Sequence, residues 1–290
     1  MSRLRWLSML RPVVARYPWA FYRASTLTGL GMWLLTREFR ENVRRNQTVL
    51  LGADGKWSWR QGWQVCTYVS QYYVDLAQVA QLNLATFEAE HLEITGHGYL
   101  RAIEQPGPVL VVSAHMGNAE FAIQALTGRG REFAALVERQ QPPEWSKFIL
   151  ELRSAAGGRF YEAGYQGLRA CLEALQKGHV VGMMADRDIQ GTGVGAVLCG
   201  RAVKLPRGPW ELARRTNALV VPMFSARKRD QDFRIYVDEP FRVEQTEDAE
   251  HDIRRAVERF AALLENQLKR DPQQWTVLED FWRVHACGEG

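Results

Sequence analysis

The hydrophobic and polar positions from about residue 90 onward predict short buried strands that alternate with amphipathic helices. Apolar runs of four or five residues, several of them bounded by Gly or Pro, are typical of strands buried in a sheet. We expect strands at 91–95, 109–112, 133–137, near Phe160, at 180–184 and at 233–237, and helices at 143–155, 166–177 and 249–269. Strands that alternate with helices imply right-handed crossovers. The pattern therefore predicts an α/β fold with a mostly parallel central sheet flanked by helices.

The amino-terminal pattern is different, because arginines are interleaved there with tryptophan and aliphatic residues. Six arginines precede the first acidic residue, Glu38; they are Arg3, Arg5, Arg11, Arg16, Arg23 and Arg37. Within this region, residues 19–35 form an apolar segment, and its 17 residues are at the lower limit for a membrane span. We therefore expect residues 1–45 to form a basic, helical, membrane-associating segment that lies in the membrane surface rather than crossing it. The alternative is that these helices pack on the rest of the protein.

Residues 46–290 are expected to form one catalytic domain, with a helical part at 56–82 and an α/β core at about 90–285. Apolar and aromatic positions over 56–82 repeat mostly at helical spacing, which predicts one long amphipathic helix. Its aromatic side chains could line a groove for an acyl chain, although each of them is also compatible with an ordinary core.

Composition and charge narrow the class of protein. The chain of 290 residues is 46% hydrophobic and 24% charged, which is typical of a globular enzyme. Its four cysteines are scattered without Cys-x-x-Cys spacing, so neither a structural zinc site nor a disulfide framework is indicated, and a reducing environment is expected. A net charge of +4 could suit nucleic acid. Because the arginines cluster with apolar residues, an anionic membrane surface is the better partner.

The first candidate for chemistry lies where the strand at 109–112 ends. His115 follows this strand, Gly117 and Asn118 supply turn and N-cap residues, and Glu120 falls in the first turn of the helix that we expect next. Ligands bind at the carboxyl ends of strands in open α/β sheets. A carboxylate on one imidazole nitrogen fixes the tautomer and leaves the other nitrogen free to take a proton from a hydroxyl. The pair could also be a half-buried histidine and a solvated acid.

No nucleophilic serine accompanies this pair. The sequence has no Gly-x-Ser-x-Gly elbow, and Ser113 lies two residues before His115 on the strand itself. A histidine base without a nucleophilic side chain favours direct attack by a substrate hydroxyl. Acyl transfer from a thioester fits this chemistry, because the thioester carries its own leaving group.

A second candidate follows the strand at 180–184, at the same sheet edge. Asp186, Arg187 and Asp188 come directly after this strand. Two aspartates at this spacing could hold a divalent ion and a sugar nucleotide in a glycosyltransferase, whereas the arginine could bind an anionic headgroup or phosphopantetheine. Asp186 could also cap a turn and pair with a nearby arginine. The Gly191, Gly193, Gly195 series opens no clear helix, so we expect a loop or hairpin rather than a dinucleotide site.

Three blocks together resemble the lysophospholipid acyltransferase superfamily, in the branch of lipid A late acyltransferases and phosphatidylinositol mannoside acyltransferases. Residues 113–120 (SAHMGNAE) are similar to its His-x₄-Asp/Glu block, and residues 185–200 (ADRDIQGTGVGAVLCG) to its Asp-containing substrate block. Residues 205–213 (LPRGPWELA) and 218–224 (ALVVPMF) follow in the same order. Residues 271–282 (DPQQWTVLEDFW) are closest to the mannoside branch. Residues 197–200 (VLCG) depart from the family, whose members often carry aromatic residues there.

The resemblance implies an O-acyltransferase that moves a fatty acyl group from acyl-CoA or acyl carrier protein to a hydroxyl of a membrane lipid or glycolipid. It implies His115 as general base with Glu120 orienting it, no metal, and no cofactor apart from the acyl donor. The substrate-binding residues that we predict are Asn118, Arg139, Arg153, Asp186 and Arg187. The expected location is the cytoplasmic face of the cell membrane, with the protein bound peripherally.

Two other functions remain open from the sequence. A metal-dependent glycosyltransferase would use Asp186 and Asp188 and would lose activity on chelation. A catalytically inactive lipid-binding protein would keep its membrane affinity after His115→Ala and would show no turnover in either form.

Overall fold

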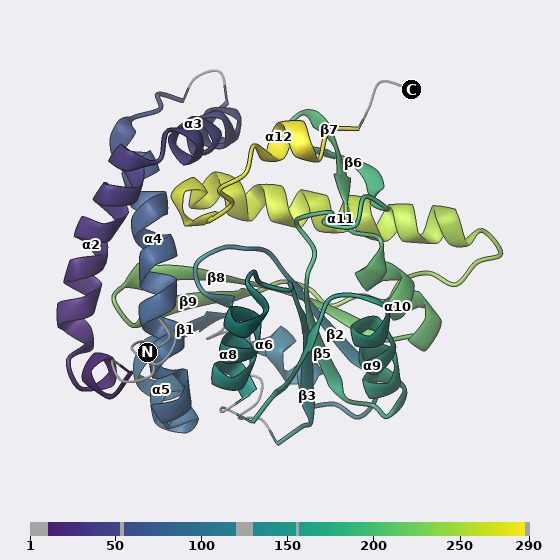
Figure 1. The fold of residues 1–290 in the computed structure, drawn as a ribbon. Coiled ribbons are helices and arrows are strands. Elements are labelled where there is room, and N and C mark those ends of the chain that lie inside the picture. Colours follow the sequence, from purple (N-terminus) through teal and green to yellow (C-terminus); the bar gives the residue numbers. More distant parts are fainter. Residues whose placement is uncertain (1–10, 53–54, 120–129, 155–156, 288–290) are drawn as a thin grey trace.

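The protein is described by a computed structural model that covers residues 11–52, 55–119, 130–154 and 157–287. Its centre is a seven-stranded sheet in the order β1-β9-β8-β2-β5-β3-β4 (Figure 1). The strands are β1 (Leu92–Thr95), β2 (Val109–Ser113), β3 (Phe133–Val137), β4 (Arg159–Glu162), β5 (Val180–Met184), β8 (Leu219–Arg229) and β9 (Asp232–Val237). All neighbouring strands are parallel except β8 and β9. The prediction of a mostly parallel sheet flanked by helices is confirmed.

The middle of the sheet is buried on both faces. All five residues of β2 are buried, and this strand pairs with β5 on one side and with β8 on the other. Continuous burial of this kind explains why the strand has an unbroken apolar sequence rather than an alternating one. Because β2 and β5 are parallel neighbours, the residues that follow them emerge side by side at one edge of the sheet.

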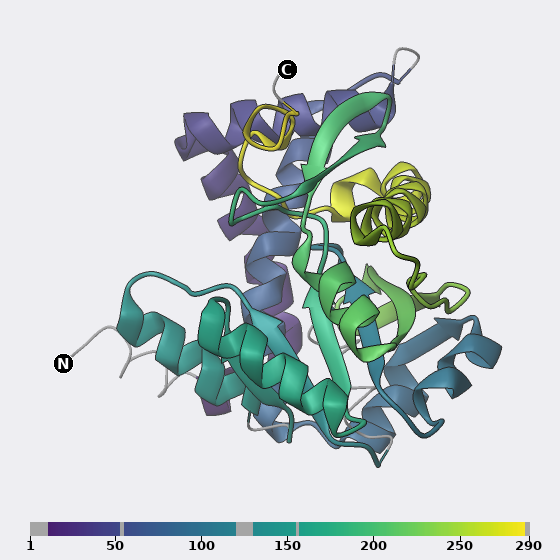
Figure 2. The same ribbon diagram turned by 90° about the vertical axis from the view of Figure 1, so that its right-hand side faces the viewer.

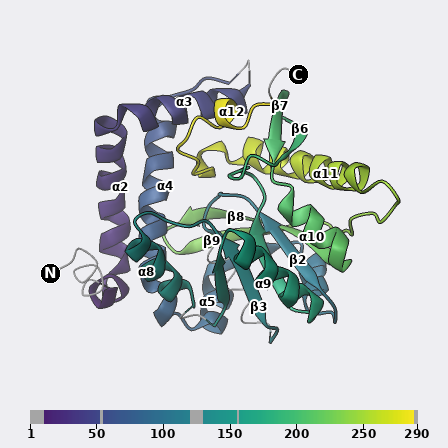
Figure 3. The ribbon, with the colours of Figure 1, turned by 45° about the vertical axis from the view of Figure 1, so that its right-hand side comes forward.

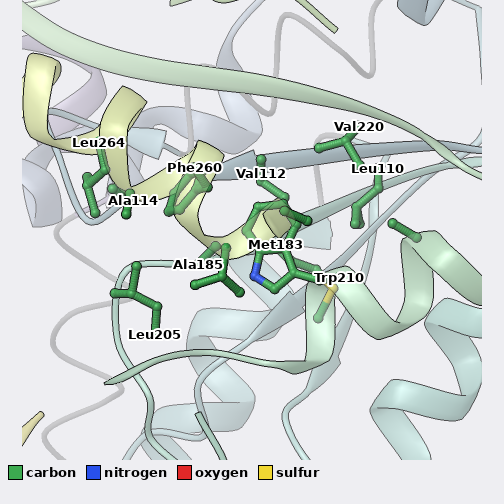
Figure 4. Packing of buried hydrophobic residues seen from close by; sticks show 14 of the residues in the cluster. Leu110, Val112, Ala114, Met183, Ala185, Leu205, Trp210, Val220, Phe260 and Leu264 are labelled. Atoms are coloured by element: carbon green, nitrogen blue, oxygen red, sulfur yellow. The ribbon is translucent and has the colours of Figure 1, made fainter. Parts of the chain in front are cut away.

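Three helices cover one face of the sheet: α9 (Tyr165–Gln176), α10 (Gly208–Thr216) and α11 (Ala249–Arg270). Figure 4 shows the core beneath them, where the ring of Trp210 from α10 lies among aliphatic side chains of β2 and β5 and near Phe260 of α11. Apolar side chains of α11, among them Ile253, Val257 and Phe260, are buried here. Among the described residues, the cluster with the most buried apolar side chains lies in this layer, and it supports the sheet edge where the site is built.

Three further helices form a separate layer at one end of the sheet: α2 (Pro18–Leu35), α3 (Arg37–Leu51) and α4 (Trp59–Gln78). α2 and α4 pack side by side along much of their length (Figures 1 and 3). A capping box between Ser58 and Gln61 begins α4, because each residue satisfies a backbone N–H of the other. The predicted helix at 56–82 is therefore α4, shorter at both ends, with a 3₁₀ turn at Val79–Gln81 after it.

Helix α2 has an unusual distribution of side chains. The residues that it buries against the protein include Tyr22, Ser25 and Gly29, whereas Leu27 is 71% exposed and Leu35 is 87% exposed. Its inner face thus carries two aromatic residues, Tyr22 and Trp33, beside small ones, while leucines lie on its outer face. Within the described residues, no helix combines the length and the apolar character that crossing a membrane requires. Arg3 and Arg5 of the basic segment lie outside these residues.

A small hairpin projects from the main sheet beside α11 and close to the carboxyl terminus (Figure 2). It consists of β6 (Val194–Leu198) and β7 (Arg201–Leu205), which confirms the predicted loop or hairpin at the glycine series. The segment after α12 (Phe281–Val284) runs along β7, where Val203 bridges to Ala286. This bridge connects the carboxyl-terminal segment to the β6–β7 hairpin, which follows Asp186 in the chain.

The close packing of α2 on α4 gives a matched pair of substitutions. A Cβ atom at Gly29 would lie 2.6 Å from the backbone nitrogen of Thr67, whereas a Cβ atom at Gly31, two residues further along α2, would meet nothing within 4 Å. We expect Gly29→Ala to lower the free energy of unfolding by about 1–3 kcal/mol, because α2 must move away from α4. Gly31→Ala should raise it by up to about 1 kcal/mol through helix propensity. Urea unfolding measures both, and equal effects of the two variants would contradict the packing described.

Candidate functional site

A cavity of about 710 Å³ opens at the carboxyl ends of the central strands. Its polar part is lined by residues that follow β2 and β5 and by the segment after α11, among them His115, Asp188 and Thr276. Its apolar part is lined by α4 and by α8 (Pro143–Ser154), through Tyr73 and Trp145. The volume is in the range of sites for small molecules, which is about 300–1,000 Å³.

The backbone after β2 carries His115 to the wall of this cavity. Gly117 has a φ of +55°, and a Cβ atom there would lie 2.3 Å from the carbonyl oxygen of Ser225, so the turn requires glycine. The backbone N–H of Gly117 donates to the carbonyl of Gln274 at 3.0 Å, and that of Asn118 donates to Ser225 Oγ at 3.2 Å. These bonds hold the turn against β8 and the carboxyl-terminal segment.

His115 is bound by the carboxylate of Asp186. The imidazole Nδ1 lies 2.8 Å from Asp186 Oδ1, and the backbone N–H of His115 donates to Asp186 Oδ2 at 3.0 Å. The indole Nε1 of Trp275 donates to the same Oδ2 at 3.0 Å. Asp186 is fully buried, whereas the His115 side chain is 31% exposed. Nδ1 faces the protein, and among the described residues none forms a hydrogen bond with Nε2.

The ionisation of Asp186 follows from these contacts. Burial alone would raise the pKa of its carboxyl group, but the charge of a protonated His115 and the hydrogen bonds from His115 and Trp275 outweigh burial and lower that pKa to about 2. Asp186 is therefore a carboxylate at any pH near neutrality. A buried carboxylate of this kind can hold an imidazole in one tautomer and stabilise the imidazolium that forms when the other nitrogen takes a proton.

The residue found on Nδ1 is not the one predicted from the sequence. Glu120, the predicted partner of His115, lies outside the described residues, so its role stays a prediction. The sequence pattern predicts Asp186 at the same sheet edge as His115, but as a substrate-binding residue. The two residues are 71 positions apart, and only the pairing of β2 with β5 brings them together.

Arg187 lies at the cavity wall between two carboxylates. Its guanidinium forms two hydrogen bonds with Glu279, at 2.8 and 3.0 Å, and one with Glu138 at 3.0 Å. Burial alone would lower the pKa of Arg187, but Glu279 and then Glu138 raise it well above its usual value. Its positive charge is thus already balanced within the protein. Binding of an anionic group by Arg187 stays a prediction.

The other predicted binding residues also line the cavity. Arg139 is largely exposed, and its Nε donates to Glu162 at 3.1 Å. Arg153 donates to the hydroxyl of Tyr72 at 2.6 Å. The side chain of Asn118 is buried and donates to Asp75. The structure thus brings Arg139, Arg153 and Asn118 to one cavity with His115.

Two further residues at the site, Trp275 and Glu279, were not among those predicted from the sequence. Trp275 binds Asp186, and Glu279 binds both Arg187 and His285, whose Nε2 lies 2.8 Å away. His285 and Arg187 outweigh the burial of Glu279 and hold the pKa of this carboxyl group at about 2. Both residues lie in the block 271–282, so the only signal for them was the resemblance of that block to the mannoside branch.

The two aspartates of a possible metal site have different partners here. Both oxygens of Asp186 accept N–H groups, and Asp188 Oδ2 accepts the backbone N–H of Gly193 at 2.7 Å. In the part of the chain that is described, no group of three or more His, Cys, Asp or Glu side chains is arranged to hold a metal ion.

Comparison with known proteins agrees with this geometry. Residues 10–284 match the family described as bacterial lipid A biosynthesis acyltransferase. The chain is also similar to phosphatidylinositol mannoside acyltransferase from two strains of Mycobacterium tuberculosis, with 31% identity over 121 residues. This match covers 40% of the chain and 37% of the relative, so the chain spans well under half of that protein's length. The resemblance inferred from the sequence is confirmed, and because the family match covers nearly all of the chain, the protein belongs to the bacterial lipid A biosynthesis acyltransferase family.

Proposed function

We propose that this protein transfers a fatty acyl group from a thioester donor, acyl-CoA or acyl carrier protein, to a hydroxyl group of a membrane lipid or glycolipid. The observation that carries the proposal is the imidazole of His115, which stands at the cavity wall with Nδ1 bound to the buried carboxylate of Asp186. This arrangement leaves Nε2 as the atom that can take a proton from the acceptor. Family membership and the mannoside acyltransferase relative support the same chemistry.

The reaction needs one base and no protein nucleophile. Nε2 of His115 takes the proton of the acceptor hydroxyl as its oxygen attacks the thioester carbonyl. The new C–O bond forms, the tetrahedral intermediate collapses with cleavage of the C–S bond, and the imidazolium returns its proton to the departing thiolate. Asp186 stabilises the imidazolium in between. A general base of this kind contributes about 10²- to 10⁴-fold to the rate.

The apolar part of the cavity fits the acyl chain. Tyr72 and Tyr73 from α4 and Trp145 and Ile149 from α8 line it, and the rings of Tyr73 and Trp145 lie 6.1 Å apart. The aromatic residues of α4 thus fall into two groups. Tyr72 and Tyr73 face the cavity, while Trp63 packs against a separate cluster that contains Trp33. Apolar walls of this extent favour a long hydrocarbon chain over a sugar nucleotide.

We expect His115→Ala to lower thiol release from acyl-CoA or acyl carrier protein by about 10²- to 10⁴-fold, because the base is lost. The matched control is His251→Ala, an exposed histidine on α11, which should keep wild-type activity. Lipid extract should stimulate the wild type and a chelator should leave it unchanged. Full activity of His115→Ala would contradict the base assignment. Loss on chelation would favour the glycosyltransferase, and membrane binding without turnover would favour the lipid-binding protein.

The same assay separates the roles of the two candidate carboxylates, Asp186 and Glu120. Asp186→Asn keeps the size of the side chain but removes the charge that stabilises the imidazolium, so we expect kcat to fall at least tenfold with little change in KM. Glu120→Gln tests the role predicted from the sequence block. A loss in Glu120→Gln with full activity in Asp186→Asn would assign the orienting role to Glu120.

The ionisation of Asp186 also predicts a dependence of stability on pH. Its pKa is about 2 in the folded protein, against about 3.9 in an unfolded chain. A depressed pKa stabilises the fold above the unfolded pKa, and this stability is lost as the pH falls through the folded one. The difference in the free energy of unfolding between wild type and Asp186→Asn should therefore shrink by on the order of 2 kcal/mol as the pH falls from about 5 to about 2. Urea unfolding at several pH values measures this, and a constant difference would contradict it.

We further propose that the outward face of α2 lies on the membrane and that the protein binds the cytoplasmic face peripherally. Its exposed apolar residues include Trp19, Leu27, Leu34 and Leu35, and the guanidinium of Arg23 lies over the ring of Trp19. Apolar side chains directed away from the core, with arginine beside them, suit the interface of an anionic bilayer. The four cysteines are free, which suits the reducing conditions of that side. In this proposal residues 1–45 attach the protein and residues 46–290 carry out the reaction.

Leu27→Glu combined with Leu34→Glu should weaken binding to vesicles that contain phosphatidylglycerol at least tenfold, since burial of each leucine contributes about 1.5–3 kcal/mol. Val197→Glu on the β6–β7 hairpin is the control, because Val197 is similarly exposed. Vesicle sedimentation measures the binding. Equal losses in the control, or none in the leucine variant, would contradict the proposed face.

A further inference from the structure

A buried ion pair lies between the amino-terminal helices and the active-site turn. Asp75 of α4 is fully buried and forms an ion pair with Arg227 of β8, whose side chain is also buried. The carboxylate of Asp75 also accepts the hydroxyl of Tyr22 from α2 and the side-chain amide of Asn118. One carboxylate therefore connects α2, α4, β8 and the turn that follows His115.

The connection to Asn118 is direct and specific. Asn118 lies three residues after His115 in a turn that depends on the positive φ of Gly117. Its backbone N–H is bound by Ser225 and its side chain by Asp75, so both ends of this residue are held by groups from outside the turn. Loss of the Asp75 contact would remove the hydrogen bond that ties the side chain of Asn118 to α4.

A second route reaches the same turn through Arg227. The backbone of Arg227 exchanges two hydrogen bonds with the side chain of Gln274, at 3.1 and 2.8 Å. The carbonyl of Gln274 accepts the backbone N–H of Gly117, and two residues later the N–H of Thr276 donates to the carbonyl of His115 at 2.9 Å. The guanidinium of Arg227 is fixed as well, because it lies 4.5 Å from the ring centre of Phe233.

We propose that Asp75 is a positioning residue for the acyl transfer, which it serves by holding Asn118, and through it the turn that carries His115, in the productive geometry, with α2 contributing through Tyr22. This inference rests on the proposed function. It means that the amino-terminal helices do more than attach the protein to a membrane. Their packing sets the position of the base even when no membrane is present.

Physical considerations favour positioning over stability as the role of this cluster. Removal of two charges from water costs about as much as their attraction returns, so apolar residues of similar size often replace a buried pair without loss of stability. The position of a catalytic base, by contrast, is critical, since a displacement of about 1 Å can cost about 100-fold in rate. The cluster orients Asn118, because a carboxylate oxygen of Asp75 accepts a hydrogen bond from its side-chain amide.

The experiment compares two double variants of the full chain in detergent, with thiol release from acyl-CoA as the readout. Asp75→Asn with Arg227→Met removes both charges and keeps an acceptor oxygen for Asn118. Asp75→Leu with Arg227→Met removes the charges and the acceptor. We expect the first to keep kcat within about threefold of wild type and the second to lose at least tenfold in kcat, with KM for acyl-CoA within about twofold in both. Thermal unfolding is measured on each.

Two single substitutions test the contribution of α2. Tyr22→Phe removes only the hydroxyl that donates to Asp75, and we expect kcat to fall two- to fivefold while vesicle binding is unchanged. Tyr99→Phe, an exposed tyrosine on α6 (His97–Leu100), is the matched control and should equal wild type.

The outcomes separate this inference from the proposed function. An inactive wild type would overturn the proposed function itself. With an active wild type, equal kcat in the two double variants would overturn the positioning role, and so would losses of kcat that follow the melting temperature. If the Leu variant does not fold, Tyr22→Phe decides, because it removes a buried hydroxyl that donates to Asp75 and accepts the side-chain amide of Gln78, whereas Tyr99→Phe removes an exposed one.

Discussion

The buried carboxylate of Asp186 is the contact on which the rest of the site depends. It accepts two N–H groups from His115 and one from Trp275, and these residues come from three separate parts of the chain. A buried charge is stable only when it is paired and hydrogen-bonded. The same contacts that keep Asp186 ionised therefore fix the imidazole, the end of β2 and the carboxyl-terminal segment relative to one another.

The carboxyl-terminal segment completes the site rather than simply ending the fold. After α11 it returns across the sheet edge, where Trp275 reaches Asp186, Thr276 binds the backbone of His115 and Glu279 binds Arg187. The carboxylate of Asp186 is thereby hydrogen-bonded, and the charge of Arg187 is balanced by a carboxylate within the protein. This leaves a partly exposed imidazole beside an apolar wall, which suits the hydroxyl activation that we propose.

The amino-terminal layer has two faces with different physical tasks. The inner face of α2 carries Tyr22 and Gly29, which allow close packing and a buried hydrogen bond to α4, while the outer face presents Leu27 and Leu35 to the surroundings. In the function that we propose, the outer face meets the membrane and the inner face supports the active-site turn. One helix would then link the location of the protein to the geometry of its base.

The sequence by itself determined the α/β class, six of the seven strands of the central sheet and His115 at a strand terminus, because hydrophobic periodicity and breakers are local signals. It did not predict β8 or α10. It also identified Asp186 at the same edge and, through the resemblance, the family. Only the tertiary structure paired His115 with Asp186, balanced Arg187 with Glu279 and joined Asp75 to Arg227, residues 152 positions apart. Such contacts depend on which strands become neighbours and how the last segment folds back, and no local pattern encodes that.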